Sequence, residues 1–230
     1  MKYILILFFL FSITLSAKTY TISGGSNNVV HLIASNILKV AYTKAGLDMK
    51  PQFMSLDKSL DFSNSGKSDG ELARIDKISS MYRNLEIVPV ELITVEAMAF
   101  SKNKDINISS WSDLKDYNIT IVKGAKFIEA GTKNIKKNVV TNFQDAINYL
   151  KTDKTEIIVI PKLAGLKIIF ENNYMDIAAV STSLKSLKLY HFVNKKNSHL
   201  IPILTPILQK MKKSGEISYW RNAYLNSISK

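Results

Sequence analysis

Three basic side chains stand at places in the chain where an anion could be held. Arg74, Lys126 and Lys162 each follow a short run of strand-forming residues. In α/β sheets, ligands bind beyond the carboxyl ends of strands, where helix N-termini add unpaired N–H groups. A guanidinium can grip a carboxylate through two parallel hydrogen bonds, which an ammonium cannot do. We therefore predict an anion site at these positions; the alternatives are a surface pair of Arg74 with Asp76 and solvated lysines.

Acidic, small and aromatic residues accompany these cations. Glu71 lies three residues before Arg74, and Glu96 is predicted either to accept a hydrogen bond from a ligand or to pair with a nearby lysine. The loop after the first predicted strand is expected to bring backbone N–H groups and short side chains close to a ligand. The candidates from this loop are Gly25, Ser26 and Asn27. Trp111 and Phe127 are candidate walls of the site, with core packing as the alternative.

The remaining reactive side chains form no pattern typical of catalysis. His31, His191 and His199 lack the His-Glu-x-x-His spacing of a zinc site and have no nucleophile motif to serve. The chain contains no cysteine, which excludes thiol chemistry and disulfides. His31 is expected to cap or pack a helix. We predict a protein that is not an enzyme and that uses neither a metal nor a cofactor.

Strand-like and helix-like segments alternate along the chain. A helix is predicted over residues 29–45, because Val30, Ile33 and Ile37 recur at steps of three and four and Gly46 is a typical helix end. Further helices are predicted at 56–65, near 110–114, from 127, and at 142–150, 162–170, 200–213 and 216–228. Strands are predicted at 19–23, 49–54, 69–74, 86–90, 97–101, 118–122, 139–140 and 156–160, the last ended by Pro161. This alternation predicts an α/β fold with mostly parallel sheets flanked by helices.

The first 17 residues are typical of a secretory signal peptide. A short basic start precedes an apolar run of about 12 residues, Ile4–Leu15, which is shorter than the ~20 residues that cross a bilayer as a helix. A membrane anchor is the alternative. Cleavage is predicted after Ala17, or else after Ser16. The remaining chain of about 213 residues suits two lobes, each large enough for its own core.

The formal charge of +12 is compatible with nucleic acid, an acidic membrane surface or a small anion as partner. The lysines are scattered as pairs, and the sequence has no zinc-finger spacing and no RNP-like aromatic motif. We therefore favour a solvated basic surface and predict no nucleic-acid partner.

Several segments, taken in order, resemble one family. They are Ser68–Arg74, Ala99–Asn103, Trp111–Lys115, Ile121–Gly124, Leu189–Asn197 and Met211–Ile217. With the leader, they are similar to the extracytoplasmic solute-binding proteins of type II topology, in the family 3 branch close to the polar amino-acid binders. The resemblance covers nearly the whole mature chain.

The resemblance implies a two-lobed periplasmic-binding-protein-like type II fold. Lobe 1 would comprise residues 18–98 and 189–230 and lobe 2 residues 99–188, with two crossing strands joining them. A small-molecule ligand would lie between the lobes, whose closure a membrane permease or receptor would detect. The resemblance also implies a periplasmic location, and we expect a monomer.

Two departures from the amino-acid binders bear on the ligand. Ala97 stands where those relatives carry an arginine for the α-carboxylate, and Lys162 stands where they carry an aspartate for the α-ammonium. A base in place of an acid repels a cationic amine and favours a carboxylate, sulfonate or phosphate-like group. We expect a small, carboxylate-bearing anionic ligand captured for a transporter. The alternatives are a sensory binding module, or a dehydratase-like enzyme with Glu71 as its acid or base.

Overall fold

The computed structural model describes residues 18–228, so the predicted leader of residues 1–17 lies outside the described part of the chain. The strands are β1 (Thr19–Gly25), β2 (Asp48–Met54), β3 (Gly70–Ile75), β4 (Leu85–Ser101), β5 (Ile119–Val122), β6 (Lys137–Val140), β7 (Ile157–Pro161), β8 (Ala178–Ala179) and β9 (Lys185–Asn194). The α-helices are α1 (Val29–Lys44), α2 (Leu56–Asn64), α3 (Ile78–Met81), α4 (Lys126–Gly131), α5 (Phe143–Lys151), α6 (Lys162–Glu171), α7 (Leu200–Lys213) and α8 (Glu216–Ile228). Two 3₁₀ helices, η1 (Trp111–Asp116) and η2 (Lys195–Asn197), complete the described chain.

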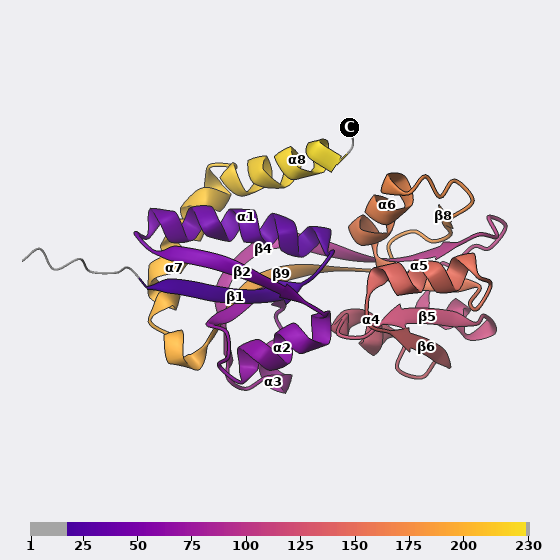
Figure 1. The fold of residues 1–230 in the computed structure, drawn as a ribbon, viewed down its shortest axis with the longest axis horizontal. Coiled ribbons are helices and arrows are strands. Elements are labelled where there is room, and N and C mark those ends of the chain that lie inside the picture. The colour runs from indigo at the N-terminus through magenta and orange to yellow at the C-terminus, as the bar shows by residue number, and fades with distance from the viewer. Residues whose placement is uncertain (1–17, 229–230) are drawn as a thin grey trace, which may run out of the picture.

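The strands form one path in the order β2-β1-β3-β9-β4-β7-β5-β6, with β8 beside β4. Pairs within each half are parallel, namely β1 with β2 and β3, and β5 with β6 and β7. The antiparallel pairs involve β4 and β9, the two strands that run from one half of the molecule into the other (Figure 1). The predicted α/β class and the two crossing strands are therefore confirmed.

Three local expectations are corrected. The segments predicted at 86–90 and 97–101 belong to one strand, β4, whose intervening residues Leu92, Ile93 and Val95 are buried, and Ile93 and Val95 continue the ladder with β9. The residues after Ser110 form a 3₁₀ helix rather than an α-helix. The strand predicted at 156–160 ends one residue later, at Pro161, which is still paired with Ala97.

Two apolar clusters give the molecule its two lobes. One lies in the half that contains α1, α7 and the β1–β3 strands, and the other surrounds β5, β7 and α5. The change of cluster falls after Val95 on β4, because Ala97 already belongs to the second cluster. Leu56 from α2 joins the second cluster, and Phe127 packs against both. The two cores therefore meet where α2 faces the start of α4 (Figure 1).

Candidate functional site

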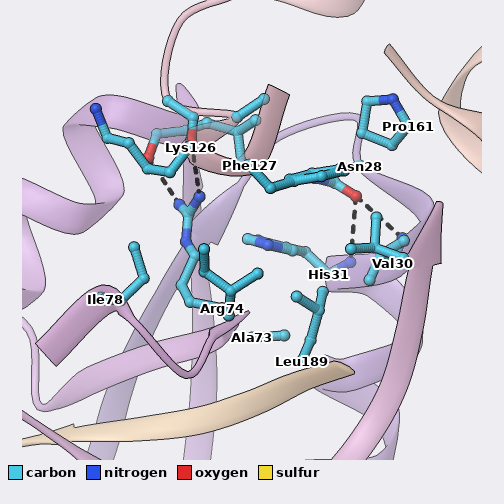
Figure 2. Close-up of a pocket in the computed structure, with 15 residues that line it drawn as sticks. Asn28, Val30, His31, Ala73, Arg74, Ile78, Lys126, Phe127, Pro161 and Leu189 are labelled. Carbon is cyan, nitrogen blue, oxygen red and sulfur yellow. Dashed lines mark hydrogen bonds between the residues drawn. The ribbon is translucent and has the colours of Figure 1, made fainter. Parts of the chain in front are cut away.

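A small cavity lies between the two lobes, at the carboxyl ends of β1, β3, β5 and β7. Its lining from the first lobe is Asn28, Val30, His31, Leu56, Ala73, Arg74, Ile75, Ile78, Val95 and Leu189, and from the second Gly124, Ala125, Lys126, Phe127 and Pro161. Figure 2 shows Arg74 beside His31, with Lys126 above Arg74 and with Phe127 and Asn28 above His31. The space open to the centre of a water molecule is about 40 Å³, enough for a few waters. A ligand of amino-acid size therefore requires the lobes to separate.

Arg74 lines the cavity, but its guanidinium is largely committed to protein groups. Nε donates to Glu71 Oε1 at 2.8 Å, and Nη2 donates to the Leu56 carbonyl and to Ser59 Oγ, both at 2.7 Å. Nη1 donates to the Gly124 carbonyl of the second lobe at 3.1 Å. Because an arginine has five N–H groups, one Nη1 hydrogen remains for another acceptor.

Glu71 lies behind Arg74 and does not line the cavity. Its side chain is fully buried, and its carboxylate accepts hydrogen bonds from three serines as well as from Arg74. Burial raises the pKa of Glu71, while the charge of Arg74 and these hydrogen bonds act in the opposite direction. The expectation that Glu71 contacts the ligand is corrected, since Arg74 stands between the two.

Lys126 and Phe127 come from the first turn of α4. Lys126 Nζ is 2.9 Å from Glu129 Oε2, and the other oxygen of Glu129 accepts the Gly124 N–H at 2.6 Å. Burial opposes the charge of the lysine, but the hydrogen bond and charge of Glu129 prevail and raise the pKa of Lys126. The ammonium at the cavity is therefore protonated at neutral pH.

Two further lining residues, Asn28 and His31, were not among the predicted ligand contacts. Asn28 caps α1, because its Oδ1 accepts the backbone N–H groups of Val30 and His31. His31 Nδ1 accepts the Gly25 N–H at 2.6 Å. Burial, followed by the charge of Arg74, lowers the pKa of His31 well below its ordinary value, so the ring is neutral. The start of α1 thus contributes one amide and one imidazole to the cavity lining, and the His31 ring lies beside Arg74 (Figure 2).

Two of the predicted ligand contacts, Glu96 and Lys162, lie in a neighbouring hollow. Lys162 Nζ is 3.2 Å from Glu96 Oε2, which is the lysine pairing that the sequence left open. This hollow also contains Arg221 of α8, and it shares Val30 and Val95 with the cavity at Arg74. The volume of this hollow that the centre of a water molecule can occupy is about 220 Å³. Glu96 and Lys162 are therefore close to the cavity without lining it.

Four other predicted contacts lie away from the cavity. Gly25 is tight against the first lobe, since a Cβ on it would lie 2.5 Å from Leu56 Cδ2. Ser26 donates its backbone N–H to Met54, and Asn27 is exposed in a left-handed turn with φ 51°. Trp111 packs onto Gly131 in the second core, so the packing alternative holds for it. For the loop after β1, the residue that lines the cavity is instead the next one, Asn28.

The hydrogen-bonding groups of the cavity that remain without a protein partner are mainly donors. Within the described residues, Asn28 Oδ1, His31 Nδ1 and both oxygens of Glu129 already accept hydrogen bonds. The unused groups are one Nη1 hydrogen of Arg74, two hydrogens of the Lys126 ammonium and the side-chain NH₂ of Asn28. Most of the remaining lining is aliphatic or aromatic. The cavity is therefore suited to a ligand that brings acceptors on an apolar body.

Neither a metal centre nor a membrane span is found in the described part of the chain. Residues 18–228 contain no group of three or more histidine, cysteine, aspartate or glutamate side chains placed to hold a metal ion. Within the same range no helix has the length and apolar character needed to span a bilayer.

Comparison with known proteins supports the fold. No protein-family profile and no curated protein matches the chain. A histidine kinase sensor domain with similarity to periplasmic binding proteins superposes with a TM-score of 0.78 at 15% identity, over 91% of this chain and 96% of that one. A mutant of ArgBP from T. maritima gives 0.76 at 16%, over 90% and 95%. AbpA, an amino acid ABC transporter substrate-binding protein from Streptococcus pneumoniae bound to L-arginine, gives 0.73 at 15%, over 91% and 95%. The chain therefore has the two-lobed fold of periplasmic binding proteins, and the predicted resemblance is confirmed at the level of the fold.

Proposed function

We propose that this protein captures a small anionic ligand between its two lobes and does no chemistry on it. The observation that carries the proposal is the cavity at Arg74, which Lys126 of the second lobe and Asn28 of the first lobe also line and whose unused polar groups are mainly donors. A carboxylate satisfies such donors, whereas an ammonium finds no unused carboxylate there. Charge-assisted hydrogen bonds to a ligand contribute about 1.5–3 kcal/mol each.

The proposed mechanism is hinge closure. The lobes, with the predicted bounds 18–98 plus 189–230 and 99–188, would rotate about β4 and β9. A ligand that contacts both lobes binds the closed form better and shifts the population towards it. A membrane partner would then recognise the closed surface. We propose that the partner is the permease of an ABC transporter and that the protein is a periplasmic monomer released by cleavage of its leader.

A sensory role is the second candidate, and one observation favours it. The histidine kinase sensor domain superposes as well as any of the compared structures, with a TM-score of 0.78. In that role the closed form would signal to a receptor instead of delivering its ligand. An enzymatic role has less support, because Glu71, its candidate acid or base, is fully buried behind Arg74.

Thermal-shift screening tests the proposal. Short carboxylates, sulfonates, phosphonates and L-amino acids, including arginine, are each added in excess. A ligand at 100 times its Kd adds about 2.7 kcal/mol of stability, which raises the Tm of a protein of this size by roughly 5–10 °C. We expect at least one acid to reach such a shift and Lys126→Ala to reduce it.

Lys133→Ala is the matched control, because Lys133 is an exposed lysine of the same lobe outside the cavity lining. It should keep the full shift. Stabilisation by cationic amino acids and by none of the acids would refute the proposed ligand class.

A further inference from the structure

The two lobes touch at a turn that only glycine can form. Gly124, between β5 and α4, has φ +89°, and a Cβ on it would lie 2.3 Å from the Asp57 backbone nitrogen and 2.6 Å from the Leu56 carbonyl carbon. Real Cβ atoms do not approach backbone atoms so closely, so any side chain here must push the turn away from α2. The second lobe therefore rests directly on the first turn of α2.

Two polar contacts cross the same junction. Lys123 Nζ is 2.9 Å from Asp57 Oδ2. Arg74 Nη1 donates to the Gly124 carbonyl at 3.1 Å, while Nε and Nη2 of the same guanidinium are held by Glu71, Ser59 and the Leu56 carbonyl in the first lobe. We call Asp57, Arg74, Lys123 and Gly124 the interlobe latch.

We propose that the interlobe latch stabilises the closed arrangement through protein groups alone, so that Arg74 acts as a positioning residue for closure. The inference rests on the proposed function, since it concerns the opening that admits the ligand. Each member of the latch bonds or contacts protein atoms of the opposite lobe, and none of these contacts needs a ligand to bridge it. A closed form populated in advance reduces the fraction of binding free energy that a ligand must spend on closure.

The absence of cysteine from the sequence makes a direct distance measurement simple. Spin labels are placed at Lys67→Cys after α2 and at Lys133→Cys after α4, both exposed positions in opposite lobes. The protein is refolded from denaturant to remove any copurified small molecule, and the distance distribution is measured by pulsed EPR. We expect the labelled parent to show mainly a short distance, and Gly124→Ala to shift the distribution to longer distances.

Gly46→Ala is the matched control. Gly46 also has a positive φ, +70°, but nothing lies within 4 Å of its Cβ position, so alanine there suffers the same kind of backbone strain without a steric clash. It should keep the short distance of the parent. Equal distributions in the parent and Gly124→Ala, or an equal shift in Gly46→Ala, would overturn the latch.

A second pair of variants tests the ionic contact. Lys123→Met should move part of the population to longer distances, whereas Lys44→Met, which removes a comparable ion pair with Glu216 inside the first lobe, should not. If Gly124→Ala and Lys123→Met keep the distances of the parent while acids still stabilise the protein, the latch is refuted and the proposed function stands. A distance shift without stabilisation by any acid would refute the function and leave the latch standing.

Discussion

Replacing Glu71 by alanine is expected to lower the free energy of unfolding by roughly 3–5 kcal/mol, the cost of leaving one partner of a buried ion pair unpaired. Glu71 is fully buried, Arg74 is nearly so, and the Nε–Oε1 distance between them is 2.8 Å. Because an arginine cannot lose its proton under physiological conditions, the unpaired guanidinium would remain charged inside the protein. Urea unfolding of the parent and the variant measures the difference.

A double variant serves as the control for Glu71→Ala. Glu71→Leu combined with Arg74→Met removes both charges and retains most of the buried volume, so it should be more stable than Glu71→Ala. A Glu71→Ala protein within about 1 kcal/mol of the parent would contradict the assignment of Glu71 as the buried partner of Arg74.

Acidification from pH 7 to pH 4 is expected to destabilise the protein by about 3 kcal/mol through His191 alone. Burial lowers the pKa of His191 to about 4, although backbone hydrogen bonds with Glu71 and Leu72 oppose the shift. In the unfolded chain the pKa is the ordinary 6.5, so below pH 6.5 the unfolded state binds the proton first. Stability is therefore full above pH 6.5 and is lost progressively as the pH falls to about 4.

The substitution His191→Gln separates this contribution from the others. The lowered pKa of His31 also reduces the free energy of unfolding as the pH falls. The raised pKa of Glu71 has the opposite effect, because the folded protein then binds the proton more readily. The difference in unfolding free energy between the parent and His191→Gln should narrow as the pH falls from 6.5 towards 4. A difference that stays constant over this range would show that His191 is not held neutral by burial.

The sequence was informative about elements because their patterns are local. The helix over residues 29–45 was predicted from the spacing of its apolar residues, and the structure places it at Val29–Lys44 with Gly46 in the left-handed conformation just beyond it. The strand over 85–101 was predicted only as two segments, 86–90 and 97–101. The backbone pairing with β9 continues from Glu91 to Ala97, and this non-local pairing joins the two segments into one strand.

The partner of Arg74 could not be predicted by the same rules. In a regular strand, residues three apart point to opposite faces. The register of β3 against β9 shifts between Glu71 and Arg74, and this irregularity places both side chains on one face. Asp76, the partner expected on the surface, instead accepts the backbone N–H of Lys77. The alternative of a surface pair with Asp76 is therefore replaced by a buried pair with Glu71.

The residues that line the cavity differ in how far local sequence patterns could predict them. Arg74, Lys126 and Phe127 were found because each ends a strand or begins a helix next to one, and that edge is where the lobes meet. Asn28 and His31 were missed although both belong to the first turn of α1 or its cap. Their exposure to the cavity depends on the approach of the second lobe, which no local pattern encodes.

Calorimetric titration with matched pairs of ligands distinguishes an anion site from an amino-acid site in the cleft. Each pair differs only in the ammonium group: propionate and L-alanine, 4-methylpentanoate and L-leucine, 3-phenylpropionate and L-phenylalanine. Because the cavity between Arg74, Lys126 and Asn28 offers donors and no unused carboxylate, the acid of the binding pair should bind about tenfold more tightly or better, a difference of at least about 1.4 kcal/mol. Tighter binding of the amino acid in that pair would show that the cleft does not select anions.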